Sequence, residues 1–280
     1  MKNNDAIAEN TVHSVDLPAS QYSPNNPPWG SLTAFLVWLL SIFLIIAVPS
    51  IALVVYLAAN GIQLSDSGAM STFILSNPNA ILVNILAIIP AHIITLVAAW
   101  LVVTNVGRYS FTEVLGWKLN GFGYLYMFAI VFGFLIAGGV LNYFIPSGET
   151  DLMKILNSSR SAALAVAFMA TFTAPIVEEV IYRGIMYSAF QKSFGPAAAV
   201  VLVTLCFALV HVPQYYESVP TILMIFSLSL TLTLIRVKTN SLLPCIILHT
   251  IFNGIQSALI IAQPYLPAAD EAKTAAAALI

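Results

Sequence analysis

The chain has 280 residues, of which 59% are hydrophobic and 8% are charged, and its formal net charge is −2. A soluble domain carries about a quarter charged residues, so this composition excludes an ordinary soluble domain and requires lipid to solvate part of the apolar surface. The small net charge gives no sign of a nucleic-acid partner. The two cysteines, Cys206 and Cys245, lie in apolar runs and do not indicate a secreted disulfide framework.

Polar segments stand at both ends of this apolar chain. Residues 1–30 are polar and finish in the proline-rich sequence YSPNNPPWG. Segments that offer so little apolar side chain to bury stay disordered, so we expect a mostly disordered N-terminal tail over 1–30. The alanine-rich residues 263–280 are predicted to form a C-terminal tail.

Between these tails, apolar runs of bilayer length follow one another. A hydrocarbon core about 30 Å thick needs about 20 apolar residues in a helix. The candidate spans are 32–58, 80–103, 122–144, 162–190, 196–212, 219–236 and 241–262. An eighth span arises if the long first or fourth run is broken at Pro49 or Pro175. We therefore predict an all-α fold, a polytopic transmembrane helix bundle with seven to eight spans, in the cell membrane.

Two segments between the spans are too polar to cross a bilayer and are expected to lie at its surface. In RYSFTEVLGWKLNG (108–121), the side chains of Phe111, Leu115 and Trp117 would then face lipid. The second segment, 146–162, has a similar amphipathic character.

Basic residues are distributed unevenly between the two sides of this topology. If the N-terminus is cytoplasmic, the inner side holds Lys2, Arg108, Lys118, Lys192, Arg236 and Lys238, and the outer side holds Lys154, Arg160 and Lys273. Cytoplasmic loops carry the excess of lysine and arginine, so a cytoplasmic N-terminus is predicted.

Ionisable residues inside the spans are costly and persist where they are paired or functional. They are Glu178, Glu179, Arg183, His92, His211 and His249. Counted from the cytoplasmic helix ends at about 1.5 Å per residue, the depths of Glu178, His211, His249 and Asn253 are roughly 18, 22, 12 and 18 Å. Three helices thus bring polar groups to similar depths, which indicates a buried site, and we expect it to open toward the cytoplasmic leaflet.

The residue types in this slab favour hydrolysis. Residues four apart share a helix face, so Glu179 and Arg183 are expected to pair while Glu178 points about 100° away. A carboxylate beside a neutral imidazole can hold a water molecule and take its proton. His249 and Asn253 also lie four apart, and an imidazole and an amide together can donate to a developing oxyanion.

Three motifs carry a family resemblance: E-E-x-x-x-R at 178–183, F-x-x-x-H at 207–211 and H-x-x-x-N at 249–253. They resemble those of the CPBP (Abi) family, which groups CAAX-type endopeptidases with bacteriocin-processing and self-immunity membrane proteins. The likeness covers roughly 108–262. A protease core is expected there, preceded by two transmembrane helices in 31–107.

This resemblance implies an intramembrane endopeptidase that uses no covalent nucleophile. Glu178 and His211 would activate the water, and His249 and Asn253 would stabilise the oxyanion, while Glu179 and Arg183 support them. The implied substrate is a peptide or membrane protein, either a CAAX-like C-terminus or a bacteriocin-type precursor. No cofactor is expected, although a zinc-dependent version would bind the metal through Glu178, His211 and His249.

Other interpretations use the same residues. A proton-coupled transporter also carries buried carboxylates and histidines, and an immunity protein could retain the motifs without catalysis. Cys245 lies one turn before His249 and could form a thiol–imidazole pair. Glu179 and Arg183 could be a buried ion pair between helices, and His92 is favoured as a packing residue. Asn84 and Asn142 are interpreted as contacts between helices.

Overall fold

The protein is described here by a computed structural model, which describes residues 22–262. Helices dominate this part of the chain, and within it the only β pairing is an isolated bridge between Ser23 and Asn26. The all-α prediction is confirmed. The predicted tails at 1–21 and 263–280 lie outside the described residues.

Within residues 22–262, seven helical segments are long and apolar enough to cross a membrane. They are α1 (Ser31–Ala59), α3 with α4 (Pro78–Leu86 and Ile88–Val103), α6 (Tyr124–Phe144), the continuous segment Arg160–Phe194, α11 (Pro196–Tyr215), α12 (Val219–Thr239) and α13 (Leu243–Ala262). Pro49 and Pro175 lie inside continuous segments and do not break them. The structure therefore has the seven predicted spans and no eighth in the described part.

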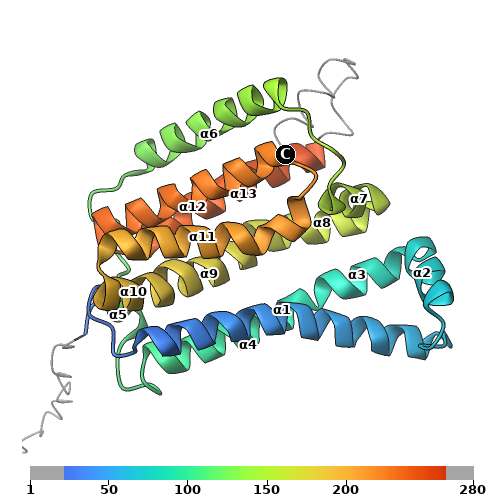
Figure 1. The fold of residues 1–280 in the computed structure, drawn as a ribbon, viewed down its shortest axis with the longest axis horizontal. Helices are drawn as coiled ribbons and strands as arrows, with labels where there is room; N and C mark the ends of the chain where they lie inside the picture. Colours follow the sequence, from blue (N-terminus) through green and yellow to red (C-terminus); the bar gives the residue numbers. More distant parts are fainter. Residues whose placement is uncertain (1–21, 263–280) are drawn as a thin grey trace, which may run out of the picture.

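The spanning helices run roughly along one direction, so the bundle has two ends (Figure 1). One end, called here the α5 end, holds residues 22–30, the short helix α5 (Phe111–Leu115) and the connections at 195 and 240–242. The other, the α7 end, holds α2 (Ser67–Ser76), α7 (Asp151–Ser158) and the connections 60–66 and 216–218. Helix α6 borders one side of the bundle, and α1 with α4 the opposite side.

The fourth span changes its helical type along its length. It consists of α8 (Arg160–Phe168), the π-helical segment η1 (Met169–Thr173), α9 (Ala174–Glu179), a second π-helical segment η2 (Val180–Met186) and α10 (Tyr187–Phe194). Pro175 has no N–H to give to the preceding turn, and a π turn accommodates such a missing bond. The two π segments lie on either side of α9, which carries Glu178 and Glu179. Such segments occur frequently at functional sites, so their position makes α9 a candidate for one.

Residues 22–30 do not belong to a disordered tail, so the prediction of a tail reaching residue 30 is wrong at this point. Trp29 is buried, and its indole N–H donates to the carbonyl oxygen of Ile185 at 3.0 Å. The guanidinium of Arg236 donates to the carbonyl oxygen of Pro24 at 2.6 Å. Burial of an indole and hydrogen bonds to a buried guanidinium stabilise this segment against the bundle.

The segment around α5 is also packed more deeply than predicted. Leu115 was expected to face lipid but is fully buried, in contact distance of Gly184. The carbonyl oxygen of Gly116 accepts from the Leu242 N–H and the Ser241 hydroxyl, both at 2.9 Å. These bonds fix α5 to the turn between α12 and α13, whereas Trp117 remains exposed as expected.

Candidate active site

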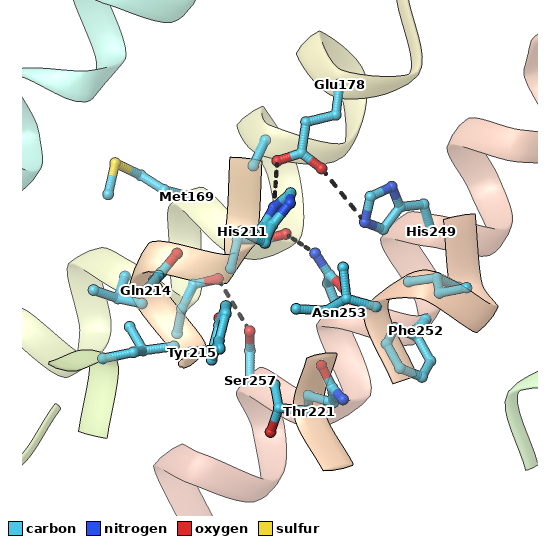
Figure 2. Close-up of a pocket in the computed structure, with 18 of the residues that line it drawn as sticks. Met169, Glu178, His211, Gln214, Tyr215, Thr221, His249, Phe252, Asn253 and Ser257 are labelled. Carbon is cyan, nitrogen blue, oxygen red and sulfur yellow. Dashed lines mark hydrogen bonds and ion pairs between the residues drawn. The ribbon is translucent and has the colours of Figure 1, made fainter. Parts of the chain in front are cut away.

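Glu178, on α9, lies between two histidines from other spans (Figure 2). Its Oε1 atom is 4.0 Å from Nε2 of His211 on α11, and its Oε2 atom is 3.7 Å from Nε2 of His249 on α13. Direct hydrogen bonds measure about 2.7–3.2 Å, so the carboxylate faces both imidazoles without bonding either. Separations beyond 3.5 Å are the ones that a bridging water commonly spans.

The ring of His211 has a defined orientation. Its Nδ1 atom is 2.7 Å from the carbonyl oxygen of Phe207, one turn earlier on α11. A carbonyl can only accept, so Nδ1 carries a proton, and the Nε2 atom of the ring faces Glu178. The Phe207 ring packs against this imidazole at a centroid distance of 4.7 Å. The side chains of Glu178 and His211 are 25% and 21% exposed, so both remain accessible from the pocket.

Glu179 lies behind the site and has no access to it. Its Oε1 atom accepts from Arg183 at 2.9 Å and from Nδ1 of His249 at 2.8 Å. The side chains of Glu179 and Arg183 are 0% exposed and that of His249 is 3% exposed. The predicted pairing of Glu179 with Arg183 is present in the structure, and it extends to His249, a contact that helical spacing alone does not predict.

Arg183 connects this carboxylate to a third helix. One guanidinium nitrogen donates to both the carbonyl and hydroxyl oxygens of Ser229 at 2.8 Å, and Nε donates to the Thr233 hydroxyl at 3.3 Å. The guanidinium also lies 4.7 Å from the centre of the Phe207 ring. Buried charges are costly unless they are paired and hydrogen-bonded, and these contacts meet that requirement for Arg183.

Asn253 lines the same pocket as Glu178, His211 and His249. Its amide donates to the carbonyl oxygen of Ala170 in η1 at 2.9 Å. One turn later, the hydroxyl of Ser257 donates to the carbonyl oxygen of Ala167 at 3.3 Å. These bonds hold α13 against the fourth span, and the Asn253 amide keeps a second N–H beyond the one that Ala170 accepts.

The pocket has a volume of about 360 Å³ and extends from Glu178 toward the α7 end. Gln214, Tyr215, Thr221 and Ser257 line the part away from the glutamate (Figure 2). Residues 22–30 lie at the opposite end, so the pocket is in the half of the bundle away from them, whereas an opening toward the cytoplasmic leaflet, on the same side as the N-terminus, was predicted. The depth estimate predicted that these polar groups lie near one another along the helices, but it could not show which half of the bundle is hollow.

Some pocket residues were not predicted from the sequence, and others were predicted to have a different role. Gln214 and Gln256 line the pocket and follow His211 and Asn253 by three residues. Residues three apart lie on the same helix face, so this spacing could have predicted both glutamines as pocket residues. His92 lines the pocket, and its Nδ1 atom is 3.0 Å from the Thr173 hydroxyl.

The asparagines proposed as contacts between helices also line the pocket. Asn142 donates to Gly138 on its own helix at 3.0 Å and accepts from the Ser147 hydroxyl at 3.1 Å. The partners of these two bonds lie on α6 and in the loop that follows it. Asn84 lines the same pocket from α3.

The thiol and metal alternatives have less structural support than the carboxylate. Cys245 is buried, and its Sγ atom lies 3.3 Å from the carbonyl oxygen of Leu232, away from the pocket lining. In residues 22–262, no group of three or more histidine, cysteine, aspartate or glutamate side chains is arranged to hold a metal ion. The residues of the proposed zinc set, Glu178, His211 and His249, lie 3.7–4.0 Å apart at their nearest carboxylate and imidazole atoms.

In the described residues, seven helical segments long enough to span a membrane surround a pocket lined by a carboxylate and two imidazoles, which defines the class as a polytopic membrane protein with an ionisable site among its helices. Residues 160–255 match the family model described as type II CAAX prenyl endopeptidase Rce1-like. This match includes all three motifs and confirms the resemblance to the CPBP family. At the family level, the match supports a CAAX-type intramembrane protease, and the seven apolar helical segments of the described residues support a multi-pass membrane protein. No curated protein and no solved structure matches the chain.

Proposed function

We propose that this protein is an intramembrane endopeptidase that cleaves a membrane-associated or C-terminal peptide by means of a water activated by Glu178. The observation that carries the proposal is the position of the Glu178 carboxylate, 4.0 Å and 3.7 Å from the Nε2 atoms of His211 and His249. CAAX-like C-termini and bacteriocin-type precursors are the two substrate kinds that the family suggests.

In the first step, the water lies between Glu178 and His211. Glu178 takes one proton, and the water oxygen forms a bond to the carbonyl carbon of the peptide, whose oxygen becomes an oxyanion. General-base catalysis by such a group contributes about 10²- to 10⁴-fold in rate. The proton on Glu178 then passes to the amide nitrogen as the C–N bond breaks, so the products are an amine and a carboxylic acid, which loses its remaining proton to water.

The oxyanion is stabilised by His249 and Asn253. His249 can donate from Nε2 only as an imidazolium, because its Nδ1 proton is already given to Glu179. The buried carboxylate of Glu179 holds Nδ1 of His249 at 2.8 Å, and Arg183 holds the same carboxylate at 2.9 Å. Loss of one oxyanion donor costs about 10²- to 10³-fold in rate. Glu179 does not touch the substrate in this proposal and acts as a positioning residue for the donor His249.

Replacement of Glu178 tests this proposal. We expect the variant Glu178→Gln to abolish cleavage, with its peptide substrates accumulating in cells and detected by mass spectrometry against cells that express the unchanged protein. The control is Glu113→Gln, an exposed glutamate on α5 outside the pocket. Full cleavage by purified Glu178→Gln protein in detergent would overturn the proposal.

The zinc-dependent and transporter alternatives give different results in the same preparation. For the water mechanism, cleavage by the purified protein continues after treatment with a chelator. Inhibition by the chelator that only zinc reverses would support the zinc version, with Glu178, His211 and His249 as ligands. Proton flux into liposomes without any peptide cleavage would instead support a transporter.

A further inference from the structure

The position of the pocket along the bundle bears on where the substrate comes from. His211 and Tyr215 lie at the end of α11, and Thr221 lies near the start of α12. Gly138 and Asn142 lie near the end of α6, and Leu152 belongs to α7 itself. Each of these positions is at or near the α7 end, so the pocket occupies that half of the bundle and has Glu178 at its base.

The opposite half of the bundle is closed by packed side chains. Leu115, Ile185 and Leu242 are fully buried between Glu179 and the α5 end, and Trp29 packs with them in one hydrophobic core. Residues 22–30 cover this end, where Lys192 donates to the carbonyl oxygen of Pro27 at 3.2 Å. A substrate therefore has no route to Glu178 through the α5 end of the described structure.

The basic residues indicate which end is cytoplasmic. Within residues 22–262, the α5 end and its flanks hold Arg108, Lys118, Lys192, Arg236 and Lys238, whereas the α7 end holds Lys154 and Arg160. Lysine and arginine near the helix ends favour the cytoplasmic side. By this rule the closed α5 end faces the cytoplasm, and the pocket faces the other side of the membrane.

We propose that the catalytic pocket is entered from the non-cytoplasmic side, and that the substrate is an apolar polypeptide segment presented from that side. An exported peptide or an extracytoplasmic segment of a membrane protein meets this requirement, whereas a C-terminus presented in the cytoplasm does not. The chemistry in this statement rests on the proposed function, but the direction of entry rests on the fold and the charges alone.

The pocket lining fits a polypeptide with apolar side chains. Ile88, Phe134 and Leu228 supply apolar surface from three helices. Gln214 and Gln256 add amide groups, each of which can both donate to and accept from a peptide backbone. Ligand pockets commonly combine a mostly apolar wall with a few polar groups that fix orientation, and this pocket has that composition.

Single-cysteine labelling with a membrane-impermeant thiol reagent tests the direction of entry. The background variant is Cys206→Ala with Cys245→Ala, which must retain Glu178-dependent cleavage. Ser65→Cys reports the α7 end and Thr112→Cys the α5 end, since both residues are exposed. Gln256→Cys reports the pocket.

We expect the reagent to label Ser65→Cys and Gln256→Cys in intact cells, and Thr112→Cys only after the membrane is permeabilised. Labelling of Thr112→Cys in intact cells would overturn the proposal, as would a Gln256→Cys that stays unlabelled where Ser65→Cys reacts. If Glu178-dependent cleavage persists in either case, the proposed function stands and only the direction of entry is wrong. If the labelling is as expected but cleavage does not depend on Glu178, the direction of entry stands and the proposed function is wrong.

Discussion

The carboxylate of Glu179 accepts a hydrogen bond from Nδ1 of His249 at 2.8 Å, although the two residues are 70 positions apart in the chain. The neighbouring carboxylate, Glu178, faces Nε2 of the same imidazole at 3.7 Å. One histidine is thus held by the buried glutamate and presented to the pocket beside the accessible one. Two adjacent residues of the same type therefore have different surroundings, because a helix turns by about 100° per residue.

The two glutamates predict a contrast between catalysis and stability. Glu178→Gln should abolish cleavage while leaving the melting temperature nearly unchanged, because this side chain is 25% exposed and bonds no other side chain directly. Glu179→Gln should lower the melting temperature as well, since breaking a buried ion pair costs about 3–5 kcal/mol. Cleavage should fall by about 10- to 100-fold, the cost of losing 1–3 kcal/mol of positioning.

A double variant separates these two effects of Glu179. Glu179→Gln with Arg183→Met removes the unpaired guanidinium, and such replacements of buried ion pairs are often neutral or stabilising. We expect the melting temperature to recover while cleavage stays low. Recovery of full cleavage together with stability would show that Glu179 serves the fold and not His249.

His211 and His92 form a second contrast, because both imidazoles line one pocket. His211→Gln should lower the cleavage rate by about 10²- to 10⁴-fold, the contribution of a general acid or base. His92→Gln should lower it by no more than about tenfold, the cost of one altered hydrogen bond, because the amide can still bond the Thr173 hydroxyl. Rates of the purified variants on one peptide decide this, and equal losses would make His92 part of the catalytic site.

Cys245 is predicted to have no part in catalysis. Its thiol is buried and bonds the carbonyl oxygen of Leu232, 13 residues away on α12. Cys245→Ala should keep cleavage within about tenfold of the unchanged protein, a loss that structural relaxation around one small buried side chain can produce. A variant that folds with an unchanged melting temperature but cleaves nothing would restore the thiol–imidazole alternative.

Gly116 should be required for the stability of the α5 end. Its φ of +78° is unfavourable for other residues, and a Cβ atom there would lie 2.7 Å from the carbonyl oxygen of Asn240. Gly121 provides the matched control, because it has a φ of +82° with no atom near its Cβ position. Gly121→Ala measures the backbone strain alone, about 1–3 kcal/mol.

Gly116→Ala should therefore lower the melting temperature further than Gly121→Ala does. The difference between the two variants reports the close approach of α5 to the turn between α12 and α13. Equal melting temperatures would show that the backbone of this turn can move away at little cost.

Much of the fold could be predicted from the sequence because bilayer-spanning helices satisfy their own hydrogen bonds and need only length and apolarity. The pairing of Glu179 with Arg183 followed from helical spacing in the same way. The lipid-facing position of Leu115 was wrong for a related reason. Amphipathic patterns show that one face is buried, but they do not distinguish burial in lipid from burial against protein.

The sequence by itself determined the seven spans, the cost of the ionisable groups within them and the residues that form the motifs, since these depend on local composition and helical period. Only the tertiary structure decided which glutamate faces both imidazoles, that residues 22–30 pack against the bundle, and that the hollow half lies at the α7 end. Those features depend on how side chains from distant segments pack against one another and where they leave a cavity. A local pattern of residues does not specify which distant segment will lie beside it.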